Sequence, residues 1–197
     1  MANANFSHQL KDFLKGNQPK TLQNLIDNFA EKSFAVLFLL LMIIPALPLP
    51  TAGVTHIFEI IAMLLALELI AGRKSVWLPK KWHNITLPIK LQTSALPALI
   101  KLISKVEKYS KQRLSKVIGN SVSARIIGLI IFILTLFAFL APPFSGLDTL
   151  PALGVVIISL ALIFEDLILC IVGLIVGVVG IGLVITLGRL VFRVFYT

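Results

Sequence analysis

The sequence predicts an all-α integral membrane protein. We expect two proline-broken helical hairpins, spanning or re-entrant, a glycine-rich C-terminal span and amphipathic surface helices. Hydrophobic residues make up 57% of its 197 residues and the mean hydropathy is +0.96, whereas soluble domains are roughly 45–50% apolar. These apolar residues form blocks. The last block runs 22 residues from Leu167 to Gly188 without a charge, enough for a helix to cross a hydrocarbon core of about 30 Å.

Residues 1–32 precede the first block and are predicted to form two short amphipathic cytoplasmic helices. Their apolar residues recur at three- and four-residue steps, as on one face of a helix. We expect both helices to pack on the protein's own cytoplasmic face; the alternative is that they lie on lipid. We do not expect this segment to be a cleaved secretory signal. The apolar positions are Phe6, Leu10, Phe13, Leu14, Leu22, Leu25, Ile26 and Phe29.

The first apolar block, residues 33–72, is interrupted by Pro45, Pro48 and Pro50. Each proline lacks a backbone N–H and disfavours helical conformation in the residue before it. The block is therefore predicted to form two helical pieces joined by a bend.

The second block, residues 126–166, repeats this plan around Pro142 and Pro143. In both blocks a Leu-Ala-Leu triplet follows the break at a similar distance, centred on Ala66 and on Ala161. Two interpretations stay open: an internal repeat, or a chance similarity among common apolar residues.

The segment between the blocks, residues 73–125, is strongly basic. It holds twelve of the 18 Lys and Arg residues and one acid, Glu107. By the positive-inside rule we expect this segment to be cytoplasmic, with the N-terminus on the same side. Charge so close to membrane blocks indicates anionic lipid headgroups as the partner and not nucleic acid. The expected lipid-binding residues are Arg73, Lys74, Lys80, Lys81, Lys101, Lys105, Lys108 and Lys111.

Two features of this basic segment place it at a membrane surface. Trp77 and Trp82 lie among four basic residues where the first block ends, which is typical of an interfacial anchor. Further along, apolar residues form a stripe in a helix whose first turn contains Pro97, and the lysines fall largely elsewhere. We expect this helix to lie on the membrane surface. The stripe is Leu99, Leu102, Ile103, Val106, Leu114 and Val117.

The C-terminal span and tail, residues 167–197, are rich in small residues. The glycines allow another helix to approach closely, so packing within the chain and homodimerisation both stay open. Cys170 is the only cysteine, which excludes an internal disulfide and a cysteine-based metal cluster. The glycines concerned are Gly173, Gly177, Gly180 and Gly182.

Ionisable groups inside the apolar blocks are functional candidates, because burying one in a membrane costs about 2.5–3.5 kcal/mol. His56 and Glu59 are three residues apart, so on a helix they share a face and can exchange a proton. The alternative is a structural pair in which the two side chains satisfy one another. Glu68 has a second interpretation as an interfacial ion pair with Arg73, and Asp148 as a helix cap.

Broken helices expose backbone polar groups, which at membrane depth must be buried in protein or line a cavity. We therefore expect a polar site between the two breaks. Its candidate substrate- or ion-binding residues are Pro48, Pro50, Thr55, His56, Glu59, Glu68, Pro143, Ser145 and Asp148.

A resemblance to a known family rests on three stretches. These are Pro48-Leu49-Pro50, the run to Leu65-Ala66-Leu67-Glu68-Leu69, and Gly72-Arg73 followed by Trp77-Leu78-Pro79. Together they resemble the ExoD family of bacterial membrane proteins. The resemblance implies a multi-pass protein of the bacterial inner membrane with a role in exopolysaccharide production or cell-envelope physiology. It supplies no catalytic residues.

The function we expect is binding or translocation of an anionic lipid or a polyisoprenyl-phosphate-linked saccharide intermediate. Two alternatives are a non-transporting interaction factor for envelope polysaccharide machinery and a proton-coupled ion transporter. The GxSxG, P-loop and HExxH motifs are missing. We therefore expect no enzyme activity, no metal and no cofactor.

Overall fold

The structure is a computed structural model in which the regular elements of the described residues are helices, apart from one isolated β-bridge between Thr21 and Thr86. The all-helical prediction is therefore confirmed for this part of the chain. The described residues are 6–47, 55–77, 79, 83–84, 86, 93, 96–108, 110, 121–142 and 145–196.

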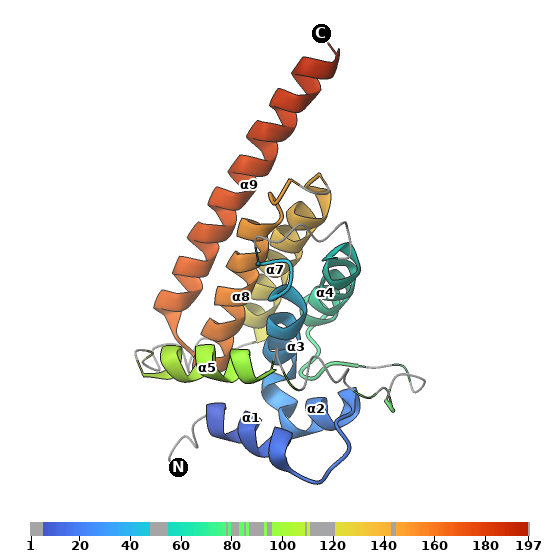
Figure 1. The fold of residues 1–197 in the computed structure, drawn as a ribbon, viewed down its shortest axis with the longest axis vertical. Coiled ribbons are helices and arrows are strands. Elements are labelled where there is room, and N and C mark those ends of the chain that lie inside the picture. Colours follow the sequence, from blue (N-terminus) through green and yellow to red (C-terminus); the bar gives the residue numbers. More distant parts are fainter. Residues whose placement is uncertain are drawn as a thin grey trace.

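A bundle of five helices forms the body of the molecule, and shorter helices cross one end of it (Figure 1). The end covered by the shorter helices is called the cap end below. Within the bundle, α3 packs against α8 and α4 against α7, and each helix also contacts its partner in the same block. The bundle helices are α3 (Ser33–Met42), α4 (Thr55–Ile70), α7 (Ser121–Leu140), α8 (Thr149–Phe164) and α9 (Leu167–Tyr196).

Each predicted hairpin block contains two helices. In the first block α3 ends at Met42, with Pro45 in the turn that follows, and in the second α7 ends at Leu140, two residues before Pro142. The second helices, α4 and α8, are both 16 residues long. The predicted bends at Pro48, Pro50 and Pro143 lie outside the described residues.

Helix α9 lies against α8 through glycines. A Cβ added to Gly154 would come within 2.7 Å of the Cα of Gly177, and one added to Gly173 within 2.9 Å of the backbone nitrogen of Ile158. The same holds at Gly180, where a Cβ would lie 2.5 Å from Pro151 Cδ. Packing within the chain therefore uses Gly173, Gly177 and Gly180, whereas nothing lies within 4 Å of a Cβ added at Gly182. Homodimerisation stays a prediction.

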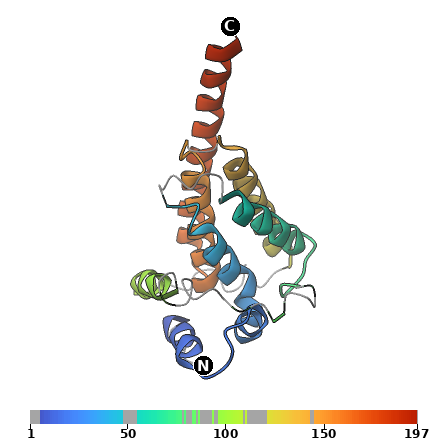
Figure 2. The same cartoon turned by 45° about the vertical axis from the view of Figure 1, so that its right-hand side comes forward.

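Two helices, α7 and α9, are long and apolar enough to cross a membrane. Figures 1 and 2 both show the C-terminal half of α9 extending past the other helices. Side chains on its outer face, among them Ile168, Val172, Ile175 and Val179, are 42–57% exposed. An apolar surface of this extent is unfavourable in water but suits a lipid environment.

The cap end is built by the two N-terminal helices, a short 3-10 helix and α5. Their apolar faces are buried against protein, with Leu10 and Leu25 no more than 2% exposed, as expected for packing on the protein itself. These elements are α1 (Phe6–Lys15), α2 (Leu22–Asn28), η1 (Ala30–Lys32) and α5 (Leu96–Glu107).

The apolar face of α5 corrects one prediction. Leu99 and Ile103, members of the stripe predicted to face the membrane, are buried, and α5 packs against α1. Glu107 joins the two helices, since its carboxylate accepts hydrogen bonds of 2.8 Å from the backbone N–H of Phe6 and the hydroxyl of Ser7. The prediction is wrong for Leu99 and Ile103, because α1 packs on this part of α5 and periodicity cannot identify the covering partner. Leu102 is 36% exposed, and Leu114 and Val117 lie outside the described residues.

Polar contacts connect the cap end to the turn between α8 and α9. Lys32 Nζ donates to the carbonyl oxygen of Ile163 at 2.7 Å and lies 3.9 Å from Glu165 Oε1. Ser110 donates to Asp166 Oδ2 at 3.0 Å. Glu165 adopts a left-handed conformation, with φ 55°, which ends α8. Glu165 and Asp166 thus form the junction between α8 and α9.

Candidate functional site

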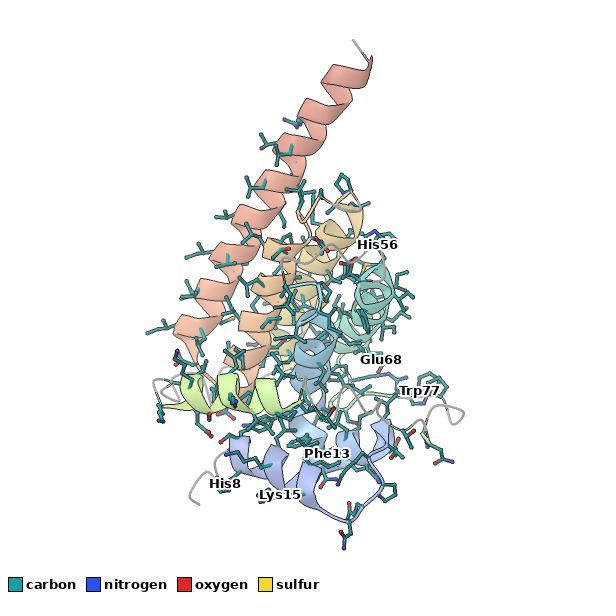
Figure 3. The ribbon with its side chains drawn as sticks, viewed as in Figure 1. His8, Phe13, Lys15, His56, Glu68 and Trp77 are labelled. Atoms are coloured by element: carbon teal, nitrogen blue, oxygen red, sulfur yellow. The ribbon has the colours of Figure 1, made fainter. Side chains whose placement is uncertain are left out.

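The candidate site lies at the end of the bundle opposite the cap end, where α4 and α8 begin. His56 and Glu59 occupy the first turns of α4, and His56 lies far from Glu68 at the other end of this helix (Figure 3). Because α4 is helical here, the three-residue spacing brings His56 Nδ1 to 2.8 Å from Glu59 Oε2. The predicted pairing of these two side chains is confirmed.

Glu59 is fully buried, whereas the His56 side chain is 25% exposed. The second carboxylate oxygen, Oε1, is buried and has no hydrogen-bond partner among the described residues. Leaving a buried polar atom unpaired costs about 1–3 kcal/mol, and more for a charged group. A proton, a cation or a hydrogen-bond donor at Oε1 would remove that cost.

The ring of Phe139, from α7, lies against the His56 imidazole, with the ring centroids 5.2 Å apart. This contact restricts the imidazole, which leaves His56 Nδ1 directed at Glu59. The hydrogen bond joins the partly exposed imidazole to the buried carboxylate. This geometry is compatible with the proton-exchange hypothesis and equally with a structural pair.

Asp148 brings the second hairpin to the same place. Thr55 Oγ1 lies 3.5 Å from Asp148 Oδ2, which connects the first residue of α4 to the residue before α8. Asp148 occupies the N-cap position of α8, as its alternative interpretation expects, but its side chain makes no capping hydrogen bond. Two carboxylates and one imidazole thus gather where the hairpins meet.

Two other candidates lie apart from this cluster. Ser145 is exposed and donates to the carbonyl oxygen of Pro142 at 2.6 Å, so it shapes the turn after α7. Glu68 is in the last turn of α4, where its Oε2 accepts a 2.9 Å hydrogen bond from the backbone N–H of Trp77. The expected ion pair between Glu68 and Arg73 is absent from the described part of the chain, because the Arg73 guanidinium lies over the Trp77 ring instead.

The predicted lipid-binding residues that the structure describes are all exposed: Arg73, Lys74, Lys101, Lys105 and Lys108. Lys80, Lys81 and Lys111 lie outside the described residues, as do Pro48, Pro50 and Pro143 of the predicted polar site.

Sequence reasoning missed Arg125, whose guanidinium lies against Gly72 at the end of α4. Gly72 has φ +85°, a conformation that favours glycine. Gly72 and Arg125 are 53 positions apart, and no pattern in the sequence indicates that they are in contact. Over the described ranges there is no cluster of three or more His, Cys, Asp or Glu side chains that could hold a metal ion, and Cys170 is a free, half-buried thiol.

Comparison with known proteins places this geometry in context. Residues 6–186 match the family described as "Exopolysaccharide synthesis, ExoD". The chain is 27% identical over 197 residues to the uncharacterized protein slr1875 of Synechocystis sp., an alignment covering 98% of this chain and 88% of that protein. It is 28% identical over 149 residues to Protein ExoD of Rhizobium meliloti, covering 74% of this chain and 61% of that protein. No solved structure matches.

Proposed function

Because the chain belongs to the ExoD family of exopolysaccharide synthesis, we propose that it carries an anionic lipid or polyisoprenyl-phosphate-linked intermediate across the bacterial inner membrane. The observation that carries this proposal is the buried His56–Glu59 pair with an unpartnered carboxylate oxygen, Oε1, where the two hairpins meet. The family supplies the physiological setting, and the geometry supports a proton-responsive carrier within it.

The length of α9 supports a site at membrane depth. The start of α8 lies against α9 at Gly180, 13 residues after Leu167 and therefore about 20 Å along the helix. The charge-free stretch of α9 spans 22 residues, or about 33 Å. If α9 crosses the bilayer, the second hairpin ends inside the hydrocarbon core of about 30 Å. This supports re-entrant hairpins, with Asp148 and its neighbours inside the hydrocarbon core, closer to the side opposite the cap end.

The distribution of charge supports separate roles for the two ends of the bundle. The site at the hairpin ends carries two acidic side chains, Glu59 and Asp148, which offer a phosphate group no complementary charge. The exposed basic residues lie beyond the other end of α4, where Arg73 is 17 residues from His56, about 25 Å along the chain if it were wholly helical. An anionic headgroup is therefore expected at the cap end, and proton exchange at the hairpin ends.

The protonation state of the His56–Glu59 pair can change which arrangement of the hairpins is favoured. A proton that moves between His56 Nδ1 and Glu59 Oε2 preserves their hydrogen bond while changing which group is charged. Binding or loss of a proton changes the net charge of the pair, and hence the cost of keeping these side chains in a membrane. Two arrangements of the hairpins that differ in access to His56 would then differ in population with pH.

Translocation by the full-length protein tests the proposal. The protein is reconstituted into proteoliposomes with a fluorescent polyisoprenyl phosphate, and transfer between leaflets is followed with an impermeant quencher, with and without a pH gradient. Glu59→Gln should abolish the stimulation by the gradient without reducing the amount of folded protein. Glu68→Gln is the matched control, because it makes the same chemical change on the same helix and keeps an oxygen acceptor for the Trp77 N–H.

Each outcome has a defined meaning. Wild-type translocation that Glu59→Gln leaves unchanged contradicts the proton-exchange role and makes Glu59 structural. Absence of translocation by the wild-type protein contradicts the carrier and supports the non-transporting interaction factor. Proton flux without lipid transfer supports the ion transporter, which the acidic site also suits.

A further inference from the structure

The stretch from Gly72 to Pro79 carried the family resemblance, but the site at the hairpin ends does not use it. Its first residue ends α4. The backbone N–H of Gly72 donates to the carbonyl oxygen of Leu69 at 3.0 Å, and the backbone N–H of Arg73 donates to the carbonyl oxygen of Glu68 at 3.2 Å. With φ +85°, Gly72 turns the chain sharply away from the helix. This turn puts Arg73 and Trp77 next to the end of α4.

Gly72 also receives a side chain from another helix. Arg125, near the start of α7, lies where a Cβ of residue 72 would be, so that this Cβ would be 2.9 Å from Nη2 and 3.1 Å from Nε. The missing side chain at Gly72 therefore makes room for the guanidinium. Arg73 directly follows Gly72 in the chain, and the Arg125 guanidinium lies against Gly72 from α7.

Both arginines are accessible. The Arg73 guanidinium lies 5.6 Å from the centroid of the Trp77 ring, an attractive cation–π contact that leaves its N–H groups free for other partners. Glu68, the nearest acid along the chain, accepts from the Trp77 N–H. In the part of the chain that is described, neither arginine has a carboxylate within 4.0 Å, and both are exposed.

We propose that Arg73, Arg125 and Trp77, arranged around Gly72, form a seat for the phosphate monoester headgroup of an anionic membrane lipid. Guanidinium groups present planar pairs of N–H donors that match phosphate oxygens, and two of them suit a doubly charged phosphate. A tryptophan that is 57% exposed beside them suits the level of lipid headgroups. The apolar part of α7 begins at Ile126, directly after Arg125, so the seat lies where the lipid's acyl chains would enter the membrane.

Headgroup binding at this seat does not depend on translocation. The seat lies about 25 Å from His56 along the chain, if that stretch is taken as helical. Lipid binding there requires no movement of the hairpins. Binding can therefore be measured separately. In the Trp82→Phe variant of the full-length protein, Trp77 is the only remaining tryptophan of the two in the chain. Its fluorescence in nanodiscs is then quenched by brominated phosphatidic acid or by brominated phosphatidylcholine, which gives their relative binding constants.

We expect a clear preference of Trp77 for phosphatidic acid. Arg73→Gln and Arg125→Gln should each lower that preference by about tenfold, or about 1.4 kcal/mol, because each variant loses hydrogen bonds to a charged phosphate. Gly72→Ala should also lower it, because a Cβ displaces Arg125. The matched control is Lys11→Gln with Lys15→Gln, which removes two exposed charges from α1 and should leave the preference unchanged.

Three results would overturn the seat. Arginine variants that keep the full preference for phosphatidic acid would show that these side chains do not bind the headgroup. An equal loss in the lysine control would reduce the effect to general surface charge. Displacement of phosphatidic acid by millimolar inorganic phosphate would identify free phosphate as the ligand in place of a lipid. Retained secondary structure of each variant, measured by circular dichroism, distinguishes these results from misfolding.

Discussion

Replacing Gly154 with Ala should weaken the contact between α8 and α9, which positions the second hairpin along the membrane span. The new Cβ would lie 2.7 Å from the Cα of Gly177 and 2.9 Å from the carbonyl oxygen of Gly173. Both are backbone atoms, so no side-chain rotation can relieve the overlap. Forced separation of packed helices costs about 1–3 kcal/mol. For a chain of this size, the midpoint of thermal unfolding should fall by roughly 2–12 °C.

Gly182→Ala is the matched control. It makes the same change on α9, but nothing lies within 4 Å of a Cβ at Gly182. Alanine favours a helix over glycine by about 1 kcal/mol, so stability should stay the same or rise. Both variants are compared by thermal unfolding in one detergent. A neutral Gly154→Ala would refute close packing of α8 on α9. Destabilisation by Gly182→Ala alone would indicate that the glycines serve a contact between two chains.

The remaining predictions concern the cap end and the topology. Glu107→Ala removes the acceptor for the first turn of α1, so limited proteolysis should release the N-terminus faster; an unchanged rate would show that apolar packing alone holds α1. Lys32→Met removes the bond to α8 and should lower stability by about 0.5–1.5 kcal/mol in denaturant unfolding, whereas Lys105→Met should not. In a Cys170→Ser background, an impermeant thiol reagent applied to intact cells should label a cysteine at Thr197 and not one at Lys32. The opposite labelling would invert the topology.

The candidate site was predictable in part, and the reason is local geometry. His56 and Glu59 lie one helical turn apart, so any helix over this segment brings them together, and the structure gives 2.8 Å. Glu68 shows the limit of the same reasoning. Its carboxylate was assigned to the nearby charge of Arg73, but the chain turns at Gly72 and presents the Trp77 N–H instead. A turn of the chain decides which residues become neighbours of a side chain, and the distance between residues in the sequence does not predict this.

The sequence by itself determined that the chain is helical, rich in membrane-compatible segments and basic between its two apolar blocks. Apolar length, charge and helical spacing are properties of single segments, and they survive whatever the segments pack against. Only the tertiary structure decided the partners. It covered α5 with α1, placed the glycines of α9 on α8, and joined Asp148 to Thr55 and Arg125 to Gly72. These contacts bring together residues 15 or more positions apart, where many pairings satisfy the same pattern and packing selects one.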